Sequence, residues 1–294
     1  MTVGVAQSSV GAAKAPAFRW LASNPAKRAT ERFHLFYAPV WGVAVGAVMM
    51  TGIAERWGDA ELLTFSLVIF AGSAFGPFVW AAPTDRGRPL TERYAFKILV
   101  WVSIFSILGN YFGTAFFYEV LHAHYGFQTQ WNWNHVPLPL YLLTVAYFST
   151  YVVLVNIGWR LARDWVRPRA PALFWPAAVA APFVVAGLES ALNANPWMRG
   201  LYCFDEPVFA LSFGTLAYGL QFLIAMPFWI GLDETPGKSQ PVGRVVVGAL
   251  AAYMMIFAAN EFLKECVAPN FTVVAHGHVG LRDYAGSCLK PPGR

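Results

Sequence analysis

A small set of acids, amides and histidines lies in or beside long apolar stretches, and these residues have the strongest potential for chemistry. Glu189 stands inside the apolar run 172–194, about one helical turn from its end, and Glu119 lies near the end of a similar run at 95–121. An ionisable side chain at membrane depth costs about 2.5–3.5 kcal/mol on insertion scales, so each one is a candidate for function. Carboxyls in apolar surroundings can exchange protons with a substrate, which makes acid–base chemistry the first expectation.

The other polar residues of this set lie at the corresponding ends of their apolar runs. Together with Glu119 and Glu189 they predict one layer of carboxyls, imidazoles and amides near Trp and Tyr, which is typical of a proton-handling pocket. Taken singly, each is also explained as an ordinary helix-end group that faces lipid headgroups, and that alternative stays open. The remaining members are His122, His124, His135, Asn193, Asn195, Asp205, Glu206, Asn260 and Glu261.

Metal and retinal chemistry have little support in the sequence. The chain has six His, with two H-x-H pairs at 122–124 and 276–278, but it lacks the H-x-x-x-H boxes of membrane di-iron enzymes. Lys264 lies at the end of the last apolar run, so no Lys stands inside that run to form a Schiff base. We therefore expect neither a metal nor a cofactor.

The three cysteines do not indicate a redox or zinc site. Cys203, Cys266 and Cys288 form no C-x-x-C pattern. Cys266 and Cys288 could form a disulfide if their segment faces an oxidising compartment.

The elements that must position these residues are membrane helices. Apolar residues make up 57% of the chain, charged residues 13%, and the mean hydropathy is +0.46, whereas soluble domains carry about 25% charge. About 20 apolar residues are needed for one helix to cross a bilayer. Seven stretches meet this requirement, and they predict an all-α, polytopic helical bundle with about seven transmembrane helices: 35–53, 62–82, 95–121, 138–158, 172–194, 207–232 and 245–263.

The distribution of Lys and Arg gives these spans a direction. Fifteen Lys and Arg fall in the N-terminal flank and every second loop after it, and six fall in the alternate segments. The positive-inside rule then predicts a cytoplasmic N-terminus and a non-cytoplasmic C-terminus. This direction places the polar layer in the outer half of the membrane. Since the basic residues are spread over loops and form no continuous face, nucleic acid is not an expected partner.

We expect three regions: a basic, amphipathic cytoplasmic flank at 1–33, the seven-helix domain at 34–263, and a C-terminal tail at 264–294. No signal-peptide core precedes the first apolar run. The expected surroundings are the lipid bilayer of the endoplasmic reticulum in a eukaryote or of the inner membrane in a bacterium. The sequence leaves the oligomeric state open.

Several strings, taken in order, resemble the cycloeucalenol cycloisomerase family over about residues 20–240. They are W-L-A-S-N-P-A-K-R (20–28), G-N-Y-F-G-T (109–114), N-H-V-P (134–137), L-E-S (188–190) and P-F-W-I-G-L-D-E (227–234). The resemblance implies a cofactor-independent sterol isomerase. Such an enzyme opens the 9β,19-cyclopropane ring of a cycloeucalenol-like sterol and yields an obtusifoliol-like Δ8 sterol.

The resemblance also implies roles for particular residues. Glu189 falls on a Glu of the family and is the expected proton donor, and Asp205 matches a family acid that would be its partner or the base. Glu119 and His135 enter as catalytic candidates on their position alone. Asn156 and seven other residues would line the pocket; the seven are Asn110, Tyr111, Phe112, Tyr118, Trp133, Asn134 and Tyr151.

Two matches, N-P-x-K-R at 24–28 and Asp233-Glu234, lie on the expected cytoplasmic side. We interpret them as interfacial anchors and fold elements. Two alternative functions stay open beside ring opening. One is a sterol double-bond isomerase, and the other is a seven-span sterol- or lipid-binding protein without enzymatic activity.

Overall fold

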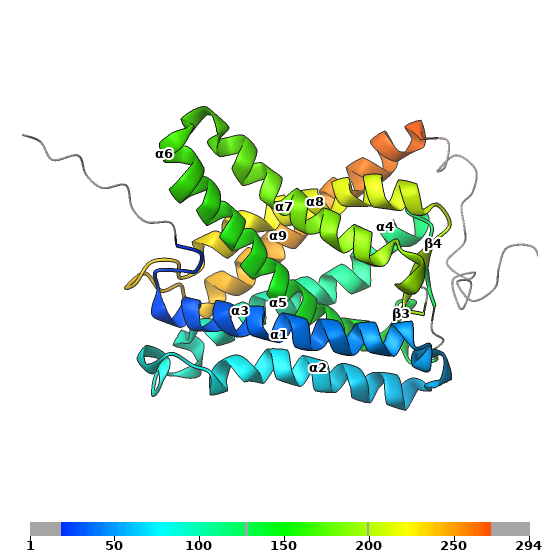
Figure 1. The fold of residues 1–294 in the computed structure, drawn as a ribbon, viewed down its shortest axis with the longest axis horizontal. Helices are drawn as coiled ribbons and strands as arrows, with labels where there is room; N and C mark the ends of the chain where they lie inside the picture. Colours follow the sequence, from blue (N-terminus) through cyan, green and yellow to red (C-terminus); the bar gives the residue numbers. More distant parts are fainter. Residues whose placement is uncertain (1–18, 127–128, 199, 272–294) are drawn as a thin grey trace, which may run out of the picture.

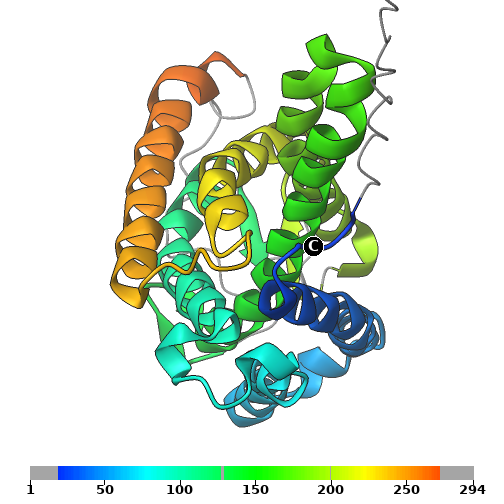
Figure 2. The same cartoon turned by 90° about the vertical axis from the view of Figure 1, so that its left-hand side faces the viewer.

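The seven predicted membrane helices are present. The computed structural model describes residues 19–126, 129–198 and 200–271. Within these ranges, seven helical stretches are long and apolar enough to cross a membrane, and they run roughly along the long axis of the molecule (Figure 1). Viewed along this axis, they form one bundle (Figure 2). Their bounds are Pro25–Met50, Asp59–Val79, Tyr94–Glu119, Leu138–Arg169, Pro171–Asn193, Pro207–Gly231 and Val242–Asn270.

Some of these stretches contain more than one helical element. The α-helices are α1 (Pro25–Met50), α2 (Asp59–Val79), α3 (Tyr94–Leu108), α4 (Thr114–Glu119), α5 (Leu138–Leu161), α6 (Arg167–Arg169), α7 (Phe174–Asn193), α8 (Pro207–Gly231) and α9 (Val242–Phe262). Turns of π-helix occupy Gly109–Gly113, Ala162–Val166 and Leu263–Val267. Short 3₁₀ turns are at Ile53–Arg56, Pro83–Asp85, Leu90–Glu92, Pro171–Leu173, Pro196–Met198 and Ala268–Asn270.

The first span begins ten residues before the predicted start at 35. The side chain of Asn24 caps α1 by accepting a hydrogen bond of 3.0 Å from the amide of Ala26, and Pro25 occupies the first helical position. Lys27 and Glu31, which broke the apolar pattern, are buried inside the bundle. A hydropathy pattern therefore misses these turns, because their buried face is charged.

Four short strands close one end of the bundle, at the right in Figure 1. β1 (Ala123–Tyr125) pairs antiparallel with β4 (Tyr202–Phe204), which joins two loops far apart in the sequence. β2 (Asn132–Trp133) and β3 (Val136–Pro137) form a hairpin. The two turn residues of this hairpin, Asn134 and His135, have φ of 52° and 61°, the left-handed backbone that a tight hairpin turn requires.

Glycine allows close contact between α7 and α8, which pack along each other. A Cβ placed on Gly219 of α8 would lie 2.1 Å from Cδ1 of Phe183 on α7. Helices that pack without a hydrophobic driving force use such small residues to bring their backbones together. This contact sets the position of α7, which carries Glu189.

The pairing of Cys266 with Cys288 considered above is wrong, because Cys266 is free and exposed. Cys288 lies outside the described residues. Cys203 on β4 is disulfide-bonded instead.

Candidate active site

A cavity opens inside the bundle at the strand-capped end. About 780 Å³ of space free of atoms lies in it, a figure that includes the open solvent at its mouth. Its walls come from α3 with the following π-helix, α4, α5, α7, α8 and α9, and Tyr125, Leu201 and Tyr202 add the strand end. Glu189 is the only carboxyl among the described residues that line it.

Two side chains hold the Glu189 carboxyl in place. The hydroxyl of Tyr151 on α5 donates a short hydrogen bond to Oε2. Nδ2 of Asn193 donates to Oε1 at 2.9 Å, from one turn further along the same helix. Both oxygens therefore have a donor, and the carboxyl is fixed at the cavity wall.

A π-helix places an amide on another wall of the cavity. The five residues Gly109–Gly113 form one such turn between α3 and α4, and single π turns inside α-helices are frequent at functional sites. Asn110 lies in this turn and is buried. Its Nδ2 donates to the carbonyl of Ser106 and to the hydroxyl of Thr144, both at 2.8 Å. Asn110 and Thr144 both line the cavity and give its wall a polar position apart from Glu189.

Aromatic rings make up much of the remaining wall. Tyr147, Phe148, Tyr218 and Tyr253 line the cavity from α5, α8 and α9. The hydroxyl of Tyr147 is buried and has no hydrogen-bond partner among the described residues, so it is available to a ligand. Tyr202 belongs to the strand end, and burial raises its pKa well above the ordinary value, which keeps its hydroxyl protonated. The wall thus offers aromatic faces and neutral hydroxyls.

The structure does not bring the other catalytic candidates into this cavity. Asp205 is half exposed and accepts a hydrogen bond of 2.9 Å from Nε2 of His124. Glu119 lies 2.5 Å from the ammonium of Lys264, and neither residue is among those that line the cavity. His135 is exposed at the tip of the β2–β3 hairpin. Among the acids of the predicted layer, only Glu189 is one of the described residues that line the cavity.

The described residues contain no group of three or more His, Cys, Asp or Glu that could hold a metal ion. No family model and no solved structure matches the chain. A comparison with characterised proteins finds cycloeucalenol cycloisomerase of Arabidopsis thaliana, 33% identical over 256 residues, which cover 85% of this chain and 90% of the plant protein. The chain belongs to the cycloeucalenol cycloisomerase family. It is therefore an isomerase.

One family string, N-H-V-P, forms the hairpin that braces the π-helix. Nδ2 of Asn134 donates to the carbonyl of Tyr111 at 2.5 Å. The hydroxyl of Tyr118 donates to the carbonyl of His135 at 2.9 Å, and that of Tyr141 donates to the carbonyl of Trp133 at the same distance. These residues support the cavity wall from behind.

Four residues predicted to line the pocket of this family member are therefore placed around it instead: Tyr111, Tyr118, Trp133 and Asn134. Phe112 is also outside the lining; it is partly exposed, and its ring packs against those of Tyr111 and Phe257. Asn110 lies in the lining, and Tyr151 reaches it through its hydrogen bond to Glu189.

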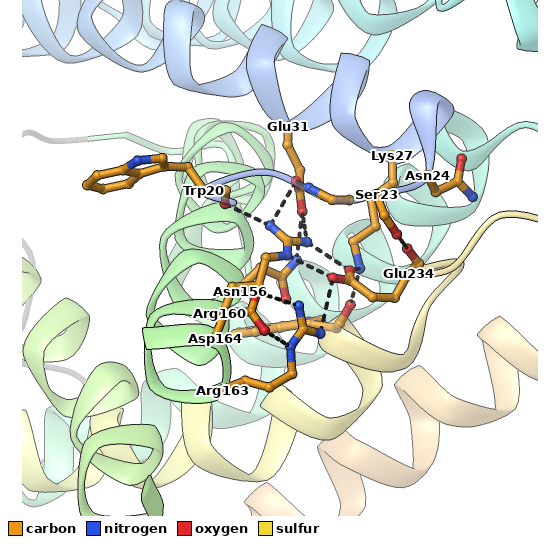
Figure 3. A network of polar contacts seen from close by, with 12 residues as sticks. Trp20, Ser23, Asn24, Lys27, Glu31, Asn156, Arg160, Arg163, Asp164 and Glu234 are labelled. Carbon is orange, nitrogen blue, oxygen red and sulfur yellow. Dashed lines mark hydrogen bonds and ion pairs between the residues drawn. The ribbon is translucent and has the colours of Figure 1, made fainter. Parts of the chain in front are cut away.

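Two further family strings meet in a buried ion network at the opposite end of the bundle, which the sequence interpretation treated as interfacial anchors (Figure 3). Arg160 on α5 binds two acids with paired hydrogen bonds. It contacts Glu31 at 2.7 and 3.0 Å and Glu234 with two bonds of 2.8 Å. Lys27 lies 2.9 Å from Glu234. Asn156, predicted for the pocket, is here instead, where it donates to Glu31 at 3.2 Å.

The charges of this network compensate each other. Lys27 and Arg160 face Glu31 and Glu234, and a neighbouring pair joins Lys97 to Asp233 at 2.7 Å. For Glu234, burial acts to raise the pKa, but the hydrogen bonds from Arg160 and the charge of Lys27 outweigh burial and hold the pKa below its ordinary value. The N-P-x-K-R and D-E strings therefore tie α1, α5 and the α8–α9 loop together. Lys27 and Glu31 are four residues apart on α1, and this spacing was the available signal that they share one helix face.

Proposed function

We propose that this protein opens the 9β,19-cyclopropane ring of a cycloeucalenol-like sterol and forms the Δ8 sterol, with Glu189 as the proton donor. One observation carries the proposal: a single carboxyl, with a hydrogen-bond donor on each oxygen, lines a largely aromatic cavity within the membrane span. A cyclopropane is a very weak base, so its protonation needs a well-placed acid in a site that excludes water. The name of the plant relative, cycloeucalenol cycloisomerase, supports the reaction class.

The first step transfers the proton of Glu189 to C19. The O–H bond of the carboxyl breaks, and the electron pair of the C9–C19 bond forms the new C19–H bond. C19 becomes a methyl group, C9 becomes a tertiary cation and Glu189 becomes a carboxylate. The hydroxyl of Tyr151 and the amide of Asn193 stabilise the negative charge as it forms.

The second step removes the hydrogen from C8, whose C–H electrons form the C8=C9 double bond. The faces of Tyr147, Phe148, Tyr218 and Tyr253 stabilise the cation until this happens. The hydrogen on C8 and C19 project from the same face of the substrate. Since Glu189 is the one carboxyl in the described cavity lining, its carboxylate is also our candidate base. The cycle then restores the acid, and no oxidant or reductant is consumed.

The neutral polar side chains of the cavity wall are suited to binding the sterol hydroxyl. Asn110 and Thr144 are joined to each other, and Gln221 on α8 donates to Asn260 at 3.3 Å. Asn110, Thr144 and Gln221 all line the cavity. A buried hydroxyl needs a hydrogen-bond partner, so these groups would hold the C3 end of the substrate.

The decisive experiment uses the purified full-length protein with cycloeucalenol in D₂O. After the product leaves, the open cavity lets the Glu189 carboxyl exchange its proton with D₂O, so we expect obtusifoliol with one deuterium in the C19 methyl group. Glu189→Gln keeps the shape but cannot donate a proton, and its rate is expected to fall at least 10³-fold. Glu119→Gln and Asp205→Asn remove carboxyls outside the cavity, and both variants should retain turnover within a few fold of the unmodified protein.

Other outcomes would contradict the proposal. Full turnover by Glu189→Gln would show that Glu189 is not the proton donor. Conversion of a Δ8 sterol without ring opening of cycloeucalenol would indicate a double-bond isomerase. Tight sterol binding without product from either substrate would indicate a binding protein.

A further inference from the structure

A second hollow lies between the first turns of α1 and the loop that follows α2, with about 750 Å³ of space free of atoms, open solvent included. It is on the side of the membrane where the ion network lies, since Lys27 and Glu31 belong to the same turns of α1. Arg28 and Arg32 line it from α1, and Arg86 lines it from the loop. Three arginines therefore line one groove.

These positive charges are not compensated by the described protein. No acidic residue lines the groove, and none of its three arginines forms a salt bridge with another described residue. Asp85 is adjacent in sequence, but it is 3% exposed and its carboxylate lies 3.7 Å from Arg88. The flank 1–33 contains a single acid, Glu31, which is already paired with Arg160.

Arg28 and Arg32 are distinct from the charges beside them in the sequence. They are four residues apart and share one face of α1, as Lys27 and Glu31 share another. Lys27 and Glu31 are buried in the compensated network, whereas Arg28 is half-buried and Arg32 is exposed. The outward pair is therefore not needed to balance the interior.

The groove continues onto an apolar surface. Val79 and Trp80, at the end of α2, line it, and they are 87% and 50% exposed. Phe36 on α1 is 60% exposed and stacks on Trp80 with ring centroids 5.7 Å apart. A ligand here would meet cations at one end and an exposed aromatic and aliphatic face at the other.

We propose that this groove, defined by Arg28, Arg32, Arg86, Val79 and Trp80, binds the headgroup of an anionic phospholipid. The arginines would hold the phosphate, because guanidinium groups match phosphate geometry with paired donors. One acyl chain would lie along Val79 and the Phe36–Trp80 stack. A free phosphate uses only the charged end, so the apolar continuation favours a lipid. Basic pockets between membrane helices bind such headgroups.

The test compares lipid binding by the full chain in detergent, measured by native mass spectrometry. The probes are phosphatidylglycerol and phosphatidylcholine with identical acyl chains. We expect tighter binding of phosphatidylglycerol, and a loss of about 30-fold in Arg28→Gln/Arg32→Gln. This fold-change corresponds to about 2 kcal/mol, or about 1 kcal/mol for each arginine near an anionic headgroup.

The matched control is Arg167→Gln/Arg169→Gln, which also removes two exposed arginines on this side of the membrane. These residues lie over the rings of Phe174 and Trp165 and do not line the groove. Binding should be unchanged in this control. An equal loss in both double variants would show diffuse surface attraction and overturn the site.

Two further arms keep the result decisive. Glycerol phosphate should displace phosphatidylglycerol only at far higher concentration than the lipid itself, and displacement at equal concentration would overturn the lipid assignment. Arg86→Gln, in a loop outside any long helix, should weaken binding several-fold even if the α1 variant folds poorly. Unchanged binding in Arg86→Gln would show that Arg86 does not contact the lipid, and it would contradict the proposed three-arginine site.

Discussion

In the proposed reaction, the two donors on Glu189 act on the charge that the carboxyl acquires when it gives up its proton. The bonds from Tyr151 and Asn193 are already formed in the structure, so they need no rearrangement as the charge develops. Their benefit is therefore greater in the transition state than in the substrate complex. A residue of this kind is expected to affect the rate of the chemical step more than substrate affinity.

Tyr151→Phe should lower kcat by about 10–100-fold and leave KM within a few fold. The change removes one hydrogen bond to a charged group, which contributes about 1.5–3 kcal/mol. The ring remains, so the packing of α5 should be preserved. Steady-state kinetics on the cyclopropyl sterol would measure the effect. A change in KM with kcat unaltered would place Tyr151 in substrate binding instead.

Tyr141→Phe is the control for this variant. Tyr141 is a buried tyrosine of the same helix, but its hydroxyl donates to the carbonyl of Trp133 in the hairpin. We expect kcat close to that of the unmodified protein.

At this scale the sequence predicted the place of Glu189 better than its surroundings. Its position inside an apolar run, one turn from the end of that run, was enough to place it at the capped end of the bundle. Asn193 is one turn further on the same helix, so its contact also follows from spacing. Tyr151 and Asn156 lie on one helix five residues apart, yet one reaches the cavity and the other the ion network. Helical spacing alone does not predict which neighbouring helix or loop each face of α5 contacts.

The position of α7 depends on how closely it approaches α8. Gly219 has no Cβ, and the ring of Phe183 occupies the place that a Cβ would take. Phe183 and Glu189 are on the same helix, less than two turns apart. A shift of α7 at this contact therefore moves Glu189 relative to the other cavity walls.

Gly219→Ala should lower stability by about 1–3 kcal/mol, the usual cost of overpacking in a dense interior. The new methyl would lie 2.1 to 2.7 Å from three atoms of the Phe183 ring. The denaturation temperature in detergent should fall, and turnover should fall with it. Gly46→Ala is the control, since a Cβ on Gly46 of α1 meets nothing within 4 Å. Equal stability of the two variants would contradict the close-contact argument.

The helices themselves were predictable because each one needs about 20 apolar residues to cross a bilayer. Their interruptions were not. The π-helix Gly109–Gly113 differs from an α-helix by a shift in hydrogen-bond partners, which leaves no mark on hydropathy. The strand pair β1–β4 joins residues about 80 positions apart and depends on how the loops meet. The predicted cytoplasmic N-terminus remains a prediction.

Over the whole molecule, polar groups are divided between two ends with different properties. The capped end holds one carboxyl and neutral hydroxyls around a cavity, a composition suited to chemistry. The other end holds two acids and two bases in direct contact, a composition suited to fixing the bundle. Removing one member of a buried ion pair leaves its partner uncompensated, which is strongly destabilising. The ion network should therefore govern stability, and its response to pH should be independent of the cavity.

The lowered pKa of Glu234 predicts the direction in which the stability of the ion network changes with pH. Its pKa in the folded protein lies below the ordinary value of 4.5, because the bonds from Arg160 and the charge of Lys27 outweigh the opposing effect of burial. A lowered pKa stabilises the fold fully above the ordinary value, and this stability is lost as the pH falls through the folded pKa. Glu234→Gln should therefore be less stable than the unmodified protein at pH 7, by about 2–3 kcal/mol.

This difference should shrink below about pH 4.5 as the unmodified protein takes up its proton, and denaturation temperatures measured from pH 7 to pH 3 would follow it. Glu92→Gln is the control, because Glu92 is exposed and its ion pair with Arg88, at 3.2 Å, is at the surface. Its curve should parallel that of the unmodified protein throughout, since exposed pairs contribute little. A constant gap between Glu234→Gln and the unmodified protein down to pH 3 would show that Glu234 acts through packing and not through its charge.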